Sequence, residues 1–144
     1  MKISIKKISI FIILLLFFIS GRKDLIDKII KIQGGGRGFA DKADKLLIIT
    51  SRVDVFNVNE INEAFKSGGM YVMNLLYALH YRKIGACPLE WGENPKNDKA
   101  LRKLVNIPDN EEVIMVISIG YPTDEFKYVT SVRNSIDESY IIIN

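Results

Sequence analysis

The sequence predicts a single α+β (α/β-like) domain. Two nearly continuous apolar runs, 45–51 and 113–119, are typical of strands that are covered on both faces. Three segments with apolar residues at helical spacing, 22–33, 59–83 and 97–105, predict helices. The chain has 144 residues, of which 48% are hydrophobic and 26% charged, so it is long enough for one core and unlike a disordered chain. Two strands are nevertheless few for a complete sheet.

The first twenty residues form a separate hydrophobic segment. Three lysines precede the apolar run 8–19, which only Ser9 interrupts. A basic start before a short apolar run is typical of an export signal or an anchor, although no small-residue cleavage site follows and a spanning helix needs ~20 residues. A buried strand is the third interpretation, because Ile and Phe dominate the run. We therefore divide the chain into the segment 1–20 and a domain over 21–144.

The segment 22–33 predicts an amphipathic helix that the following glycines end. Its apolar residues share one broad face; they are Leu25, Ile26, Ile29, Ile30 and Ile32. Asp24 lies in the first turn, where a carboxylate is favourable against the helix dipole. The glycine run 34–38 lacks the Gly-Lys-Ser/Thr of a phosphate-binding loop, so we interpret it as a helix end followed by a flexible loop.

The long helix over 59–83 contains two adjacent glycines. Its apolar residues follow the helical period; they are Phe65, Val72, Leu75, Leu76 and Leu79. Gly68 and Gly69 interrupt it, and each costs about 1 kcal/mol relative to Ala. The pair indicates either the close approach of another backbone or a cofactor ring, or poor helix chemistry that the fold tolerates. Both interpretations stay open.

The stretch "GACPLEW" follows the long helix and contains the only Cys and the only Trp. One Cys excludes an intramolecular disulfide, and a single His80 leaves too few ligands for zinc. Gly85 is expected to end the helix between His80 and Cys87, which argues against a nucleophilic Cys–His pair. We predict that Cys87 is a small buried hydrophobe and that His80 caps or packs near the helix end. We expect neither a metal site nor a catalytic side chain.

The C-terminal part of the chain ends in an apolar tail. The helix over 97–105 is predicted to have Asn97 as its N-cap. The segment 124–138 is polar and loop-like. Residues 141–143 are all isoleucine, so we expect this end to dock as a strand or against a partner.

Charge argues against nucleic acid as a partner. The net charge of +3 arises from 20 basic and 17 acidic residues, and the basic residues are scattered along the chain. Nucleic-acid-binding domains gather Lys and Arg on one face. The sequence therefore predicts an ordinary surface of mixed charge.

From residue 21 onward the order of elements resembles the nitroreductase family of FMN-dependent flavoproteins. The resemblance rests on "GRKDLIDKII", "GGGRGFADKADKLLIIT", "GGMYVMNLLYALHYRKIGACPLEW", "LRKLVNIPDNEEVIMVISIGYP" and "SVRNSIDE". It implies a nitroreductase-like sheet flanked by helices, with a long central helix. It also implies an intertwined homodimer with FMN at the interface and the long helix in the dimer core, which would explain the two adjacent glycines.

The resemblance assigns the cofactor contacts to "PLEW", as a turn whose backbone N–H groups face the flavin ring near N5 and O4. The cofactor-binding residues would be Pro88, Leu89, Glu90 and Trp91. Main-chain amides supply such donors without a titratable side chain, so the carboxylate of Glu90 need not be catalytic. Cys87 would support the turn.

The resemblance also assigns the FMN phosphate to Arg133 in "SVRNS". A guanidinium suits phosphate through a charge-assisted fork, whereas spacing alone would favour a solvent-facing loop Arg. Ser131 stands where many relatives carry a second basic residue, so it would offer one hydrogen bond instead.

The implied function is an oxidoreductase that passes electrons from NAD(P)H through FMN to a nitro or quinone-like small molecule, in the cytoplasm. The family's N-terminal helices, with their Arg-Ser-Arg and Asn-x-Gln-Pro type motifs, have no counterpart here. We therefore hypothesise an N-terminally truncated or frame-altered member in which 10–19 takes the place of a missing strand. The alternative is a non-catalytic remnant that keeps the fold core and can dimerise. A third interpretation is a membrane-associated protein held through 8–19.

Overall fold

The computed structural model describes residues 14–36, 38, 42–43, 45–60, 62–125 and 132–143. Its strands are β1 (Leu14–Ser20), β2 (Lys45–Arg52), β3 (Gly85–Glu90) and β4 (Glu111–Gly120). Its helices are α1 (Lys23–Gln33), α2 (Glu63–Tyr81) and α3 (Pro95–Val105), followed by the short 3-10 helix η3 (Ile136–Glu138). The α+β prediction is confirmed.

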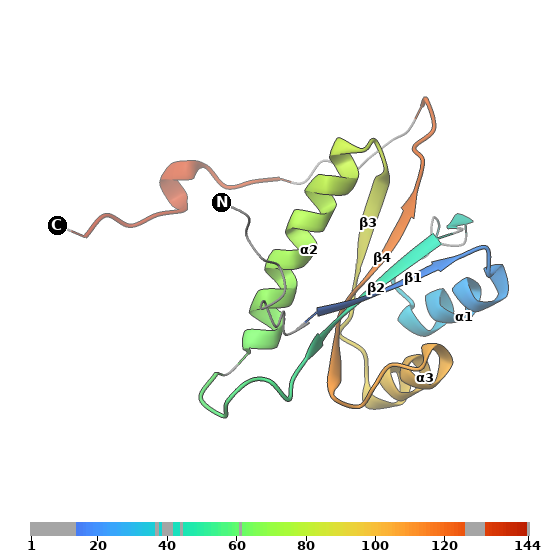
Figure 1. Cartoon of the computed structure of the whole chain (residues 1–144). Helices are drawn as coiled ribbons and strands as arrows, with labels where there is room; N and C mark the ends of the chain where they lie inside the picture. The colour runs from blue at the N-terminus through green and yellow to red at the C-terminus, as the bar shows by residue number, and fades with distance from the viewer. Residues whose placement is uncertain are drawn as a thin grey trace, which may run out of the picture.

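The described strands form one antiparallel sheet in the order β1-β2-β4-β3. Helix α2 covers one face of the sheet, and α1 and α3 lie side by side on the other (Figure 1). Strands β1 and β3 are therefore the two edges. This arrangement leaves the outer side of β3 without a strand partner in the described chain.

Strand β1 comes from the hydrophobic N-terminal segment. It pairs with β2 over its whole length, from Leu14 opposite Ser51 to Ser20 opposite Lys45. Residues 14–20 of that segment therefore form a strand, which was the third of the three interpretations. Residues 1–13 lie outside the described residues. No described helix combines the length and the apolar character that crossing a bilayer requires.

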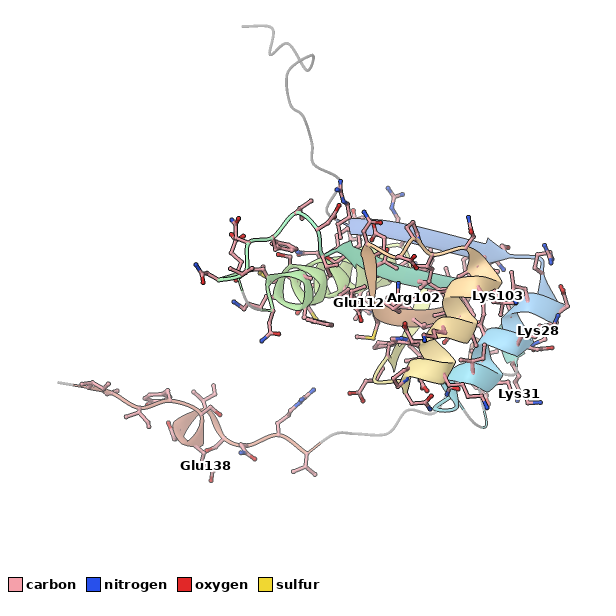
Figure 2. The ribbon with its side chains drawn as sticks, turned by 90° about the horizontal axis from the view of Figure 1, so that it is seen from below. Lys28, Lys31, Arg102, Lys103, Glu112 and Glu138 are labelled. Atoms are coloured by element: carbon pink, nitrogen blue, oxygen red, sulfur yellow. The ribbon has the colours of Figure 1, made fainter. Side chains whose placement is uncertain are left out.

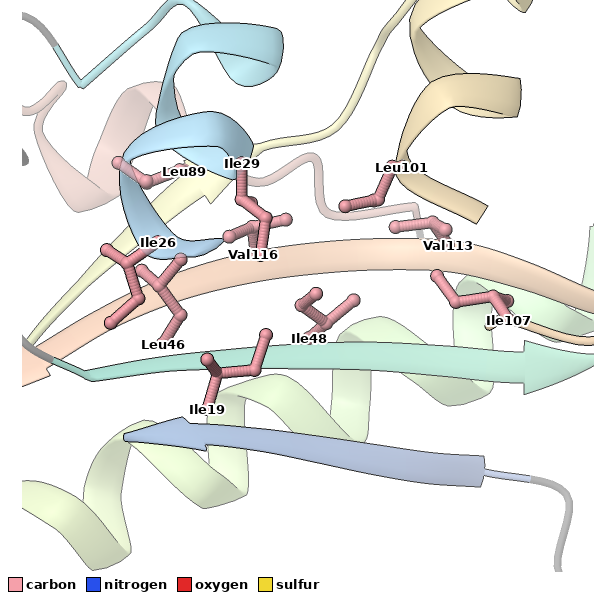
Figure 3. Close-up of a cluster of buried hydrophobic side chains, with 10 residues drawn as sticks. All are labelled: Ile19, Ile26, Ile29, Leu46, Ile48, Leu89, Leu101, Ile107, Val113 and Val116. Atoms are coloured by element: carbon pink, nitrogen blue, oxygen red, sulfur yellow. The ribbon is translucent and has the colours of Figure 1, made fainter. Parts of the chain in front are cut away.

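The main core lies between the sheet and the pair α1 and α3 (Figure 3). Ile26 and Ile29 from α1 and Leu101 from α3 are completely buried against strand residues such as Val116. This confirms the amphipathic helix predicted over 22–33. Gly34 caps α1 with φ of 73°, a left-handed conformation that glycine adopts without strain, and its N–H bonds to the carbonyl of Ile30.

A second, smaller core lies between the sheet and α2. Ala64, Gly68 and Val72 are buried on the face of α2 that packs on the sheet. A Cβ at Gly68 would lie 2.8 Å from side-chain carbons of Ile114, so this glycine permits close approach by a strand side chain. The close approach expected from the sequence is present at Gly68, where the side chain of Ile114 makes it. Gly69 faces open space.

Phe65, one of the apolar residues at helical spacing, is 51% exposed, because it lies on a second apolar stripe of α2 that faces away from the sheet. Two local predictions were wrong. The turn that the resemblance implies at Pro88 to Trp91 is not a turn as far as Glu90, because Pro88 to Glu90 belong to the edge strand β3, and an edge position tolerates Pro88. The N-cap of α3 is Asn94, whose Oδ1 accepts hydrogen bonds from two backbone N–H groups, and Asn97 lies inside the helix.

The C-terminal segment 132–143 extends away from the body of the molecule (Figure 1). Its apolar residues are exposed, with Ile141 and Ile143 at 90% and 92%. The docking expected from the sequence is therefore not made within the described part of this chain.

Candidate functional site

The outer edge of β3 borders two pockets. One has a volume of about 560 Å³ and is lined by Gln33 and Gly35, together with β3 and the residues that follow it. The other, of about 980 Å³, is lined by the C-terminal end of α2 and by β3, and His80 contributes to it. Because α1 and α2 lie on opposite faces of the sheet, the two pockets open on opposite sides of the edge strand. Pro88 lines both.

The backbone of β3 alternates between its partner strand and its free edge. The carbonyl of Cys87 is turned toward β4, where it accepts a hydrogen bond of 3.4 Å from Ser118 Oγ. The carbonyl of Glu90 is turned the other way and accepts one of 2.9 Å from Gln33 Nε2. In a strand the N–H and C=O of one residue point to the same side, so the N–H of Glu90 also faces the free edge. Pro88, which has no N–H, occupies an edge-facing position as well.

Gln33 holds this part of the strand in place. It is the last residue of α1 and only 8% exposed, and its Oε1 accepts a hydrogen bond of 2.8 Å from the N–H of Gly35. The sequence reading missed Gln33. A signal was present, because Gln33 follows Ile26 and Ile29 on the buried stripe of α1, and a buried amide requires partners.

A second set of polar contacts anchors the turn after β3. The indole Nε1–H of half-buried Trp91 donates to Asp98 Oδ1 at 3.2 Å, and Asp98 Oδ2 lies 2.5 Å from Arg102 Nε. Arg102 also donates to the carbonyls of Pro108 and Glu111, and its guanidinium lies 3.2 Å from a carboxylate oxygen of Glu112 (Figure 2). The turn is thereby tied to α3 and to the start of β4.

Cys87 is half-buried and packs against the main core. Burial raises the pKa of its thiol, which lowers the thiolate fraction and disfavours a nucleophilic role. His80 is exposed in the last turn of α2. Within the described ranges, no three His, Cys, Asp or Glu side chains gather closely enough to hold a metal ion.

The structure brings some of the predicted site residues together and leaves others apart. Pro88, Leu89 and Glu90 line the smaller pocket, and Trp91 lies next to it in the chain. Arg133 is exposed on the C-terminal tail and lines neither of the two pockets. Ser131 lies outside the described residues. Within one chain, the turn after β3 and the guanidinium of Arg133 therefore share no cleft in the described structure.

The chemistry of the smaller pocket suits the edge of a flat heteroaromatic ring. The edge-facing N–H of Glu90 supplies a donor for ring acceptors, and the backbone at Gly92 borders open space. The carboxylates of Glu90 and Glu93 line the same pocket and would repel an anion. A phosphate carried by such a ring compound thus needs a cation from elsewhere.

The model of the nitroreductase family ("Nitroreductase family") matches residues 18–121, which is most of the chain. The chain belongs to the nitroreductase family. The matched range runs from β1 to just beyond β4, so it includes the segment from Pro88 to Trp91 and ends before the tail that carries Arg133.

Solved nitroreductase-family structures share this fold. The FMN-dependent nitroreductase of Clostridium difficile R20291 superposes with a TM-score of 0.71 at 17% identity, over 92% of this chain and 76% of its own. A nitroreductase from Desulfovibrio desulfuricans in complex with FMN gives 0.68 at 17% identity, over 91% and 72%. A Parabacteroides distasonis protein named as an NADH dehydrogenase/NAD(P)H nitroreductase gives 0.64 at 18%, over 83% and 68%. No curated protein matches the chain significantly by sequence.

Proposed function

We propose that this chain is a cytoplasmic FMN-dependent oxidoreductase that takes electrons from NADH or NADPH and passes them to a nitro or quinone-like small molecule. Membership of the nitroreductase family supports the reaction class. The FMN-bound relative supports the cofactor, and the relative named for NADH and NAD(P)H supports the reductant. The observation that carries the proposal is the backbone of Glu90, which faces a pocket at the free edge of β3.

In this proposal the protein contributes a fixed main-chain donor. The N–H of Glu90 would bind the acceptor edge of the flavin ring, and Pro88 would lie against the ring. Leu89 is 4% exposed and anchors the strand in the main core, so the donor needs little reorganisation when the ring binds. When bound, FMN would supply the hydride chemistry.

We propose that Arg133 binds the FMN phosphate, with Ser131 as a second contact. The two carboxylates of the smaller pocket require such a cation, and a guanidinium binds phosphate through two parallel hydrogen bonds. Because Arg133 lies on the extended tail, it can reach a phosphate near β3 only if the tail folds onto a body, either its own or that of a second copy.

A homodimer is the proposed assembly, and α2 carries the surface for it. An exposed stripe recurs every fourth residue along this helix; it consists of Phe65, Gly69, Met73, Tyr77 and Tyr81. An apolar stripe of this length is unusual on the surface of a monomer. Open space at Gly69 would allow a second helix to approach closely at its centre. The exposed isoleucines of the tail add further apolar surface.

A second candidate function is a non-catalytic member of the family that keeps the fold core and dimerises. The separation between Arg133 and the smaller pocket favours it, because no lysine or arginine among the described residues lines that pocket.

Equilibrium dialysis of the purified full chain against FMN separates the two candidates. The enzyme proposal expects one FMN per chain and a bound flavin that NADH or NADPH reduces without oxygen. Arg133→Gln should raise the dissociation constant about tenfold, the effect of one charge-assisted contact. The matched control Arg22→Gln, an exposed arginine beside α1, should leave it unchanged. A chain that takes up no FMN at any concentration would instead support the non-catalytic candidate.

A further inference from the structure

The side chain of Gln33 bridges two parts of the pocket wall. Its Nε2 donates to the carbonyl of Glu90 at 2.9 Å, and its Oε1 accepts from the N–H of Gly35 at 2.8 Å. Glu90 offers an acceptor and Gly35 a donor, so only this orientation of the amide satisfies both. Gln33, Gly35 and Glu90 all line the same pocket.

Gly35, the second residue after α1, leaves room for the side chain of Gln33 because it has no Cβ. A Cβ at Gly35 would lie 2.9 Å from Gln33 Nε2, closer than real Cβ contacts come, and 3.2 Å from Oε1, which is also tight. Any larger residue at this position would therefore push the amide away from Glu90. The hydrogen bond from Gln33 to Glu90 thus depends on a glycine at position 35.

We propose that Gln33 is a positioning residue of the flavin site, which acts through the peptide group that joins Glu90 to Trp91. This inference rests on the proposed function. The carbonyl and the N–H of Glu90 face the same free edge, whereas the N–H of Trp91, at the far side of the trans peptide, points the other way. A hydrogen bond donated to the Glu90 carbonyl fixes the plane of this peptide and, with it, the position of the N–H of Glu90 at the pocket.

A neighbouring contact shows how this role differs from holding the fold together. Asn97 Nδ2 donates to the carbonyl of Ile32 at 3.1 Å and to a carboxylate oxygen of Glu93 at 2.7 Å. Asn97 thus ties α3 to the end of α1, as Gln33 ties the end of α1 to β3. It makes no bond to the peptide between Glu90 and Trp91, so it serves as the matched control.

Two substitutions test the bridge in the full chain. Gln33→Glu keeps the acceptor for Gly35 and removes the donor to Glu90, whereas Gln33→Met removes both at similar volume. Amide hydrogen exchange of Gly35 in the FMN-free protein reports which bond each variant retains. The dissociation constant for FMN and the midpoint potential of the bound flavin report the effect on the site.

We expect both Gln33 variants to raise the dissociation constant for FMN about three- to tenfold, the effect of one weakened hydrogen bond. We also expect a more negative midpoint potential, because a displaced N–H of Glu90 stabilises the electron-rich reduced ring less. Asn97→Ala should lower thermal stability and shift the midpoint potential less than either Gln33 variant.

A Gln33→Glu variant with wild-type affinity and potential would overturn the inference, and so would an equal shift of potential in Asn97→Ala. In either case FMN binding by the wild type would leave the proposed function standing. A wild-type chain that binds no FMN would overturn the proposed function and this inference together.

Discussion

The indole of Trp91 and the carboxylate of Asp98 are joined by a hydrogen bond of 3.2 Å, which links the end of the edge strand to α3. The other oxygen of the same carboxylate binds Arg102, whose guanidinium reaches the start of β4. The residues that would contact a flavin are therefore held by side chains that lie behind them.

Trp91→Phe removes this hydrogen bond and keeps an aromatic ring. The expected cost is about 1 kcal/mol in the free energy of unfolding, together with a weaker affinity for FMN. Denaturant unfolding and FMN titration measure the two effects. Asp98→Asn keeps an acceptor oxygen for the indole, so it should affect FMN binding less than Trp91→Phe. The reverse order would show that the hydrogen bond does not position the turn.

Arg102→Met should destabilise the fold much more than a substitution on the exposed side of the same helix. The side chain of Arg102 is 15% exposed, and its loss removes one donor each from Asp98 Oδ2 and from the carbonyls of Pro108 and Glu111. We expect a loss of about 2 to 4 kcal/mol in the free energy of unfolding. The matched control Lys103→Met alters an exposed neighbour (Figure 2) and should change it by less than about 0.5 kcal/mol. Equal losses in both variants would contradict the assigned role.

Gly68→Ala should destabilise α2 although alanine is the better helix former. The new Cβ would lie 2.8 Å from carbons of Ile114, and such overpacking costs about 1 to 3 kcal/mol. Urea unfolding measures the loss, and shortening the neighbour in Gly68→Ala/Ile114→Ala should remove the clash, so the two substitutions should be clearly non-additive. Additive effects would mean that the glycine serves no packing purpose. Gly69→Ala introduces no clash with the described residues and, at concentrations at which the chain is monomeric, is the control for helix propensity.

Asp54 should make the protein sensitive to strong acid. Hydrogen bonds from Arg52 and then from Asn110 lower the pKa of this carboxyl from its ordinary value of 3.8 to about 2. Since the folded-state pKa is the lower one, the stabilisation is present above 3.8 and is lost as the pH falls toward 2. Denaturant unfolding across this pH range should show that the free energy of unfolding falls less with acid in Asp54→Asn than in the wild type. Asp109→Asn, in the adjacent loop, should keep the wild-type dependence.

The sequence was sufficient for the parts of the fold that depend on local pattern. The apolar runs at Leu46–Ile49 and Val113–Ile117 could only be buried strands, and the stripe through Ile26 and Ile29 placed α1 on the sheet. The family resemblance supplied the position of the candidate site, which spacing alone would not have revealed.

The features that could not be predicted from the sequence depend on contacts between segments that are distant in the chain. Helical spacing placed Phe65 on an apolar stripe but could not show which of the two stripes of α2 faces the sheet. The resemblance implied a turn at Pro88, and nothing in the local sequence reveals that this residue would lie in a strand at the edge of the sheet. The hydrogen-bond partner of Gln33 is Glu90, which lies 57 residues later in the chain, so the role of Gln33 follows only from the folded structure.

Amide chemical shifts of the labelled full chain during FMN titration test the central claim most directly. If the main-chain donor at the end of β3 binds the flavin ring, the largest shifts should occur at Leu89, Glu90 and Trp91, with Gly35 next among the residues of the pocket. Strand β1, at the opposite edge of the sheet, should remain unaffected. The account would be contradicted by saturable FMN binding that changes the amide chemical shifts of β1 or of the outer face of α3 and leaves those of Leu89, Glu90 and Trp91 unchanged.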